Sequence, residues 1–110
     1  MSVRKTLCQV ADVPDGGATA VDAGSAENPE SLIVLRQHSR VFAYRNECPH
    51  TGRRLDWSPG RFLIEGNQII CAAHGACFFI DSGRCFAGPA RGDALSAVAI
   101  EIVDGKVVLV

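Results

Sequence analysis

The strongest constraint on the fold is a series of short apolar runs, each of which ends at turn residues after a few positions. The segments SLIVLRQ (31–37) and RVFAYR (40–45) are separated by only two residues, and NQIICA (67–72) and ACFFI (76–80) are also close together. All four are rich in the β-branched and aromatic residues that favour strands. No window of helical length has a clean period of about 3.6 residues. The sequence therefore predicts an all-β fold in which 31–37 and 40–45 form a hairpin.

Two further regions complete this pattern. The C-terminal segment AIEIVDGKVVLV (99–110) has two strand-like halves around Asp104 and Gly105, a pair that is typical of a tight hairpin turn. Residues 12–31 are rich in Gly, Ala, Asp and Pro, and we expect a pair of short edge strands with loops there. Together these segments predict small antiparallel sheets.

The chain has 110 residues, which is enough for one hydrophobic core and suggests a single domain over 1–110. The formal net charge of −1, without any block of Lys or Arg, gives no reason to expect nucleic acid as a partner.

The apolar runs are far shorter than the ~20 residues that a membrane-spanning helix needs, and the N-terminus lacks a signal-peptide pattern. We therefore expect a cytoplasmic protein. Its odd number of cysteines suits reduced thiols or metal ligands better than disulfides: Cys8, Cys48, Cys71, Cys77 and Cys85.

Four residues form a spaced pattern typical of metal ligands. Cys48 and His50 are one residue apart, and Cys71 and His74 follow about twenty residues later with two residues between them. A lone Cys or His is usually structural, but two Cys-then-His pairs in loops beside strands favour a metal site. A structural zinc ion could use the same four ligands, although zinc fingers commonly place both cysteines in one loop and both histidines on a helix. A loop that supplies one of each suits a two-iron cluster better.

At this point the sequence resembles the Rieske [2Fe-2S] family. The resemblance is carried by CPHTG (48–52), CAAHGACF (71–78) and SGRCFAGP (82–89), the last matching a proline-containing loop over the cluster, and it covers about 42–95. It implies a Rieske-type fold with a two-loop cluster-binding subdomain over about 45–92 and one [2Fe-2S] cluster.

The same resemblance implies a role for each ligand. Cys48 and Cys71 would bind one iron, and His50 and His74 would bind the other. Two thiolates leave the oxidised centre formally neutral, whereas four would make it a dianion, so histidine ligation raises the reduction potential. Electrons would enter and leave through the imidazole edges, which lie at the surface in this family.

Two departures from the respiratory members of the family narrow the subclass. Arg53 and Ala73 occupy the positions at which those proteins carry a disulfide between the loops. Ala76 and Phe78 occupy the positions of a Ser and a Tyr whose hydroxyl groups bond to the cluster and to a ligand sulfur. Without these hydrogen bonds we expect a potential near the lower end of the Rieske range of about −150 to +300 mV.

This profile resembles the soluble Rieske ferredoxins of ring-hydroxylating oxygenases. It implies an electron-transfer protein rather than an enzyme, one that receives electrons from a reductase and passes them to a terminal oxygenase or other oxidoreductase in transient complexes. Two alternatives stay open: an accessory or regulatory Rieske-like subunit of a larger oxidoreductase, of the nitrite reductase small-subunit type, and a structural module with one metal ion in a Cys2His2 site.

Residues outside the ligand set have simpler interpretations. Arg53 and Arg54 are equally compatible with a docking face and with solvated loop charges. His38 fits a solvated turn position. Four large apolar residues are expected in the core or shielding the cluster: Trp57, Phe62, Phe78 and Ile80. Three cysteines are expected not to bind the metal: Cys8, Cys77 and Cys85.

Overall fold

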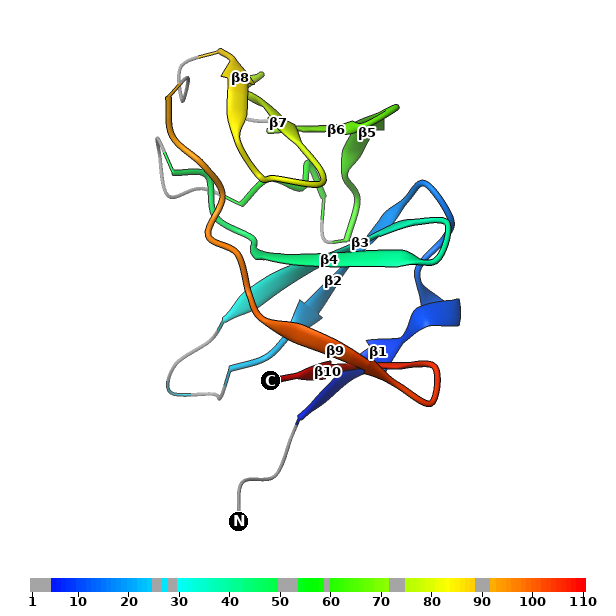
Figure 1. Ribbon diagram of the computed structural model, residues 1–110. Helices are drawn as coiled ribbons and strands as arrows, with labels where there is room; N and C mark the ends of the chain where they lie inside the picture. Colours follow the sequence, from blue (N-terminus) through cyan, green and yellow to red (C-terminus); the bar gives the residue numbers. More distant parts are fainter. Residues whose placement is uncertain are drawn as a thin grey trace.

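The computed structural model describes residues 5–24, 27, 30–49, 54–58, 60–71, 75–88 and 92–110. Within these ranges the only helical element is the 3-10 turn η1 (Val10–Asp12), and the strands form three small antiparallel sheets. Figure 1 shows the sheets stacked along the long axis of the molecule, with β2–β4 in the middle. The predicted all-β fold is confirmed.

The middle sheet has the order β2 (Ala18–Asp22), β3 (Ser31–Gln37), β4 (Arg40–Arg45). β3 and β4 have the predicted bounds and pair through the register Gln37 to Arg40, so the predicted hairpin is confirmed. The expected pair of strands in 12–31 is wrong, because the described part of that segment has one edge strand, β2, and the rest serves as connections. One strand is enough to cover the free edge of β3.

A second sheet brings the two ends of the chain together, in the order β1 (Thr6–Gln9), β10 (Lys106–Leu109), β9 (Ile100–Val103). The turn between β9 and β10 has Asp104 and Gly105 at φ of 50° and 74°. Positive φ at both central residues is the condition for the tight hairpin turn that the Asp-Gly pair predicts. This hairpin is therefore set by local sequence.

The third sheet has four strands of three residues each, in the order β5 (Leu63–Glu65), β6 (Gln68–Ile70), β7 (Cys77–Phe79), β8 (Cys85–Ala87). β6 and β7 are shorter than 67–72 and 76–80, because the chain leaves the sheet on both sides of the second predicted ligand pair. Phe78 is fully buried while Phe79 is 39% exposed, as strand alternation predicts. Phe79 stacks on Phe86 of β8 on the outer face, with ring centroids 4.2 Å apart.

The apolar core has two parts that meet at β3. Ile33 and Leu35 belong to the part that packs against the third sheet, and Val34 belongs to the part that packs against β10. Both faces of β3 are therefore buried, which explains its nearly continuous apolar sequence.

A buried hydrogen bond joins the middle and third sheets. The hydroxyl of Tyr44 in β4 donates to the carbonyl oxygen of Ile80 at 2.6 Å. Gly83 lies against the same ring, so closely that a Cβ atom there would come within 2.7 Å of Tyr44 Cε1. The third sheet is thus held in a fixed position over β4.

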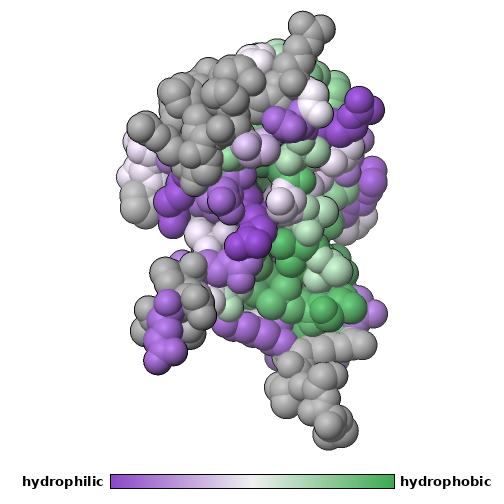
Figure 2. Space-filling view, turned by 90° about the vertical axis from the view of Figure 1, so that its left-hand side faces the viewer, coloured by the Kyte–Doolittle hydropathy of each residue, from purple (hydrophilic) through white to green (hydrophobic). Residues whose placement is uncertain are grey.

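The surface departs from one expectation. Trp57 is 58% exposed, so its predicted place in the core is wrong. It lies beside the Arg61 guanidinium, 5.9 Å from the ring centroid, which is within reach of a cation–π contact. The face in Figure 2 has hydrophilic side chains across the middle and hydrophobic ones at the level of β9 and β10. No helix in the described ranges has the length and apolar content to cross a bilayer.

Candidate metal centre

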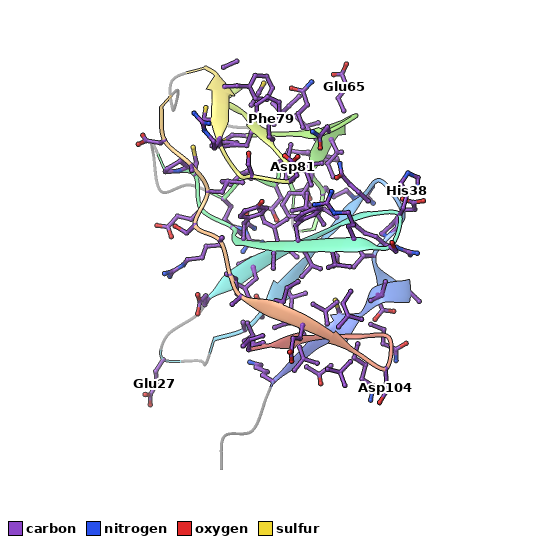
Figure 3. All side chains as sticks on the ribbon, in the orientation of Figure 1. Glu27, His38, Glu65, Phe79, Asp81 and Asp104 are labelled. Carbon is purple, nitrogen blue, oxygen red and sulfur yellow. The ribbon has the colours of Figure 1, made fainter. Side chains whose placement is uncertain are left out.

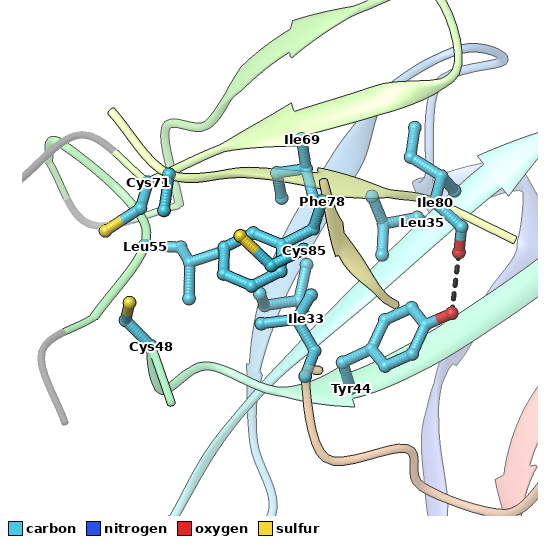
Figure 4. Close-up of a cluster of buried hydrophobic side chains, with 12 residues drawn as sticks. Ile33, Leu35, Tyr44, Cys48, Leu55, Ile69, Cys71, Phe78, Ile80 and Cys85 are labelled. Atoms are coloured by element: carbon cyan, nitrogen blue, oxygen red, sulfur yellow. Dashed lines mark hydrogen bonds between the residues drawn. The ribbon is translucent and has the colours of Figure 1, made fainter. Parts of the chain in front are cut away.

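The two predicted cysteine ligands lie at one end of the core between the middle and third sheets. Cys48 follows β4 by three residues and Cys71 comes directly after β6. Both are fully buried and belong to the same cluster of core residues. Figure 4 shows their sulfur atoms on facing sides of a gap at the edge of this cluster, with Leu55 beside them. Strands of two different sheets therefore bring together thiols that are far apart in the sequence.

The predicted histidine ligands, His50 and His74, lie outside the described residues. The described residues include no group of three or more His, Cys, Asp or Glu side chains that could hold a metal ion. Of the four predicted ligands, the structure therefore describes the two cysteines, Cys48 and Cys71. The chemistry of these two fits iron, because buried cysteine sulfurs are the standard protein ligands of iron–sulfur clusters.

The second ligand loop is closed by two backbone hydrogen bonds. The N–H of Cys71 donates to the carbonyl of Ala76 at 2.7 Å, and the N–H of Gly75 donates to the carbonyl of Cys71 at 2.8 Å. Gly75 has a φ of 72°, which a residue with a Cβ atom rarely adopts. Cys71 is therefore held at the base of a tight loop.

The segment after β8 lies directly against this loop. A Cβ atom at Gly88 would come within 2.7 Å of Ala76 Cα, and Gly88 itself has a φ of 91°. The absence of a side chain at Gly88 therefore permits this close contact between the two segments. Pro89, the proline of the segment that resembles the family's loop over the cluster, lies outside the described residues.

The first ligand loop is closed by side chains. The side-chain oxygen of Asn46, just before Cys48, accepts a hydrogen bond from the N–H of Leu55 at 2.9 Å. The side-chain amide of Asn46 also donates to Asp56 Oδ1 at 3.3 Å. Asn46 is 5% exposed, so the two sides of the loop are joined by a buried polar residue.

Asp56 is the acceptor at the centre of this closure. Its side chain is 2% exposed and receives two hydrogen bonds from Arg54, from Nε at 3.0 Å and from Nη2 at 2.8 Å. The N–H of Gly60 adds a third at 3.0 Å. Burial would raise the pKa of Asp56, but the hydrogen bonds outweigh it and lower the pKa below its usual value. The group is therefore a paired, buried carboxylate.

This network was not predicted from the sequence. A polar Asn between strand β4 and a candidate ligand, with an Asp after the buried Leu55, is the signal that could have indicated it. The network also changes the interpretation of Arg54, whose guanidinium is used within the loop. Arg53, the other arginine considered for docking, lies outside the described residues.

The remaining cysteines are placed in different surroundings. Cys77 Sγ lies 3.4 Å from the carbonyl of Gly75, and Cys85 Sγ lies 3.2 Å from that of Ala87. Cys85 is buried in the same core cluster as the candidate ligands, whereas Cys8 packs against the other part of the core. Burial, aided by Asp12, raises the pKa of the Cys8 thiol. That these three do not bind the metal stays a prediction.

The other predicted residues lie as expected. His38, at the turn between β3 and β4, has a 92% exposed side chain, and its Nδ1 lies 3.3 Å from Asp15 Oδ2. Figure 3 shows it at the turn that joins β3 and β4. Phe78 and Ile80 are buried, and Phe62 packs against the core cluster. His38 is thus a solvated turn residue.

Comparison with known proteins gives a consistent result. The family model described as the Rieske [2Fe-2S] domain matches residues 4–103. Among curated proteins, the chain is 26% identical over 100 residues to a 3-phenylpropionate/cinnamic acid dioxygenase ferredoxin subunit of Shigella flexneri, covering 91% of this chain and 86% of that protein. These matches extend beyond the ligand loops to nearly the whole chain.

Solved structures agree with the sequence matches. The chain is 30% identical to the ferredoxin of Sphingomonas yanoikuyae B1, with a TM-score of 0.75 and 97% of each chain covered. It also matches a chain in a complex of reduced oxygenase and oxidised ferredoxin of carbazole 1,9a-dioxygenase, with 21% identity and a TM-score of 0.77 over 99% of this chain and 94% of that one. The second likeness concerns the fold alone.

Proposed function

This chain belongs to the Rieske [2Fe-2S] domain family, and from this premise we propose that it carries single electrons from a reductase to a terminal oxygenase or another oxidoreductase. The bound [2Fe-2S] cluster supplies one-electron redox chemistry. The observation that carries the proposal is the placement of Cys48 and Cys71, two buried thiols that separate loops bring to one end of the core.

We propose the following ligand set. Cys48 and Cys71 hold one iron through their thiolates, and His50 and His74 hold the other through their imidazoles. The burial of the two thiols supports their part of this assignment, because it would keep the sulfur ligands away from water. The chain would act as one domain over 1–110, with the cluster-binding region at about 45–92.

The residues around the thiols would keep the potential low. Ala76 and Phe78 are fully buried beside Cys71 and carry no hydroxyl group that could bond to a sulfur. Because such hydrogen bonds raise the potential, we expect a midpoint in the lower part of the Rieske range, below about +100 mV. Voltammetry of the purified protein measures this directly.

The partner class follows from the relatives. Those named above are ferredoxin components of dioxygenase systems, which supports a carrier that docks transiently and performs no catalysis itself. On this proposal the protein works in the cytoplasm, where a reductase can reload it. An accessory subunit of a larger oxidoreductase would hold the same cluster but would not exchange electrons with a free reductase.

The test begins with purification without oxygen and reconstitution with iron and sulfide. The proposal expects two iron and two acid-labile sulfide per chain, and a paramagnetic resonance spectrum of the reduced protein that is typical of mixed Cys and His ligation. It also expects the reduced protein to be reoxidised by a Rieske oxygenase in stopped-flow mixing. A colourless protein with a single zinc ion would overturn the proposal in favour of a structural module.

A further inference from the structure

We propose that Asn46 and Asp56 form a clasp that positions the first ligand loop, and thereby determines how firmly the protein retains its cluster. The inference rests on the proposed function, since it concerns the loop that would hold Cys48 and His50. The clasp is defined as the side-chain contacts among Asn46, Asp56 and Arg54, together with the backbone N–H groups of Leu55 and Gly60 that they bind.

The clasp joins the two sides of the loop where they meet the rest of the protein. On the incoming side, the N–H of Asn46 donates to the carbonyl of Ser31 at 2.9 Å, and its side-chain amide lies 3.2 Å from the Ser31 hydroxyl. Asn46 is thus fixed to the start of β3. On the return side, its side-chain oxygen accepts the N–H of Leu55. One side chain therefore connects β3, β4 and the end of the ligand loop.

The connection is local to the loop and spans the position of Cys48. In the described residues, the backbone hydrogen bonds around Cys48 do not cross from 46–49 to 54–56, so the Asn46 side chain makes this crossing. Leu55, which it holds, is fully buried in the same cluster as the two thiols. Displacing Leu55 would therefore change the packing beside both of them.

The hydrogen-bonding groups of the clasp are complementary, because the carboxylate of Asp56 only accepts and the groups that contact it only donate. Asp56 receives hydrogen bonds from four groups, all of them donors: two on Arg54, the side-chain amide of Asn46 and the N–H of Gly60. An amide in place of the carboxylate puts an NH2 group against at least one of these donors. A carboxylate at 46 instead faces the carboxylate of Asp56. Leaving a buried polar group without a hydrogen-bond partner costs more free energy than a typical hydrogen bond contributes to stability.

This specificity gives a sharp test, which is the exchange of the two side chains. Asn46→Asp places two acceptors against each other, and Asp56→Asn places an NH2 group against one donor of Arg54 and against either Asn46 or Gly60. In the double variant an amide at 56 can donate to a carboxylate at 46, and that carboxylate can still accept the N–H of Leu55. A clasp therefore predicts that the double variant recovers part of what each single variant loses.

The measurement is the rate at which iron is released to a chelator from the reconstituted protein, followed by loss of visible absorbance. We expect each single variant to release iron about tenfold or more faster than the unsubstituted protein. In the exchanged variant, the increase in the logarithm of the release rate should be at most half of the increase seen in the single variants. The matched control is Asp15→Asn, because Asp15 accepts the N–H of His38 at 2.7 Å at the opposite end of the hairpin. It should release iron at the unsubstituted rate.

The outcomes separate this inference from the proposed function. If the unsubstituted protein binds no iron and sulfide, the proposed function fails. If it binds them and the single variants release iron no faster than Asp15→Asn, or if the exchanged variant is worse than either single one, the clasp is overturned. If the single variants do not fold, Arg54→Gln removes the guanidinium and leaves Asn46 and Asp56 in place. The clasp then predicts a release about threefold faster, and an unchanged rate overturns it.

Discussion

The two ends of the β3–β4 hairpin are built in opposite ways. At the end with His38 and Ser39, two residues suffice to turn the chain, and an exposed aspartate, Asp15, accepts the backbone N–H of His38. At the other end the chain leaves β4 for the first ligand loop, and a buried aspartate, Asp56, is surrounded by donors. A structural turn can rely on water and local backbone geometry. The first candidate ligand loop is closed instead by buried side chains whose donors and acceptors are matched.

The largest expected effect separates a proposed metal ligand from another buried thiol in the same core cluster. Cys71→Ser replaces the buried thiol of a proposed ligand by a hydroxyl, which binds iron far more weakly, so we expect bound iron and acid-labile sulfide to fall to near zero. Cys85→Ser is the matched control, since Cys85 is buried in the same cluster and is predicted not to be a ligand. Elemental and sulfide analysis of both variants checks this. Equal loss of iron from both would contradict the ligand assignment.

The next prediction compares one substitution in two regions. Gly88→Ala forces a Cβ atom to within 2.7 Å of Ala76 Cα at a φ of 91°, whereas at Gly105, with a φ of 74°, nothing lies within 4 Å. We expect Gly88→Ala to lower the free energy of unfolding by about 3 kcal/mol, and Gly105→Ala by about 1 kcal/mol. Denaturant unfolding measures both. A loss at Gly88 no larger than the loss at Gly105 would mean that the segment around Gly88 does not pack tightly against Ala76.

A smaller effect is expected at the bond between the middle and third sheets. Tyr44→Phe removes the hydroxyl that donates to the carbonyl of Ile80 and leaves that buried oxygen without this partner. We expect a loss of about 1–2 kcal/mol in the free energy of unfolding. Tyr44→Leu serves as the comparison, because it also removes the ring that packs against Gly83 and should cost more. Equal losses in the two variants would show that the ring contributes little beyond the hydrogen bond, and an unchanged stability of Tyr44→Phe would show that the hydrogen bond itself contributes little.

The smallest expected effect is on the pH dependence of stability, in which Asp56 and Asp15 should differ. Asp56 has a folded-state pKa below its unfolded value of about 3.9, so its contribution to stability is present above pH ~4 and is lost as the pH falls toward the folded pKa. The pKa of Asp15 is also lowered, chiefly by the N–H of His38, but this group is exposed and salt screens its ionic part. Unfolding between pH 3 and 6 should therefore depend less on pH in Asp56→Asn than in Asp15→Asn. A larger change in Asp15→Asn would reverse this ranking.

The fold was predictable where local chemistry decides it. Asp104 and Gly105 specify their turn through positive φ, and the alternation of β7 places Phe78 inside and Phe79 outside. Trp57 was misplaced because large apolar size favours burial but does not say which side of an irregular loop faces the core. Its exposure follows from the tertiary position of that loop.

The sequence pattern singled out the two thiols that the structure brings together, but not the residues that support their loops. The spacing of the Cys and His pairs carries the chemistry of a metal site, and the burial of Cys48 and Cys71 agrees with it. Asn46 and Asp56 are ten residues apart in the sequence, and no strand or helix periodicity relates the two positions. The geometry of their loop, which sequence patterns do not encode, is what brings them together.

The burial of β3 on both faces has a consequence for engineering. Ile33 and Leu35 belong to the buried cluster that also contains the two thiols, while Val34, between them in sequence, packs in the other part of the core. A fragment that begins at Cys48 would lack these β3 residues, so we expect that the two candidate ligand loops could not fold as an independent unit. Any attempt to graft them onto another scaffold must carry the central strand along.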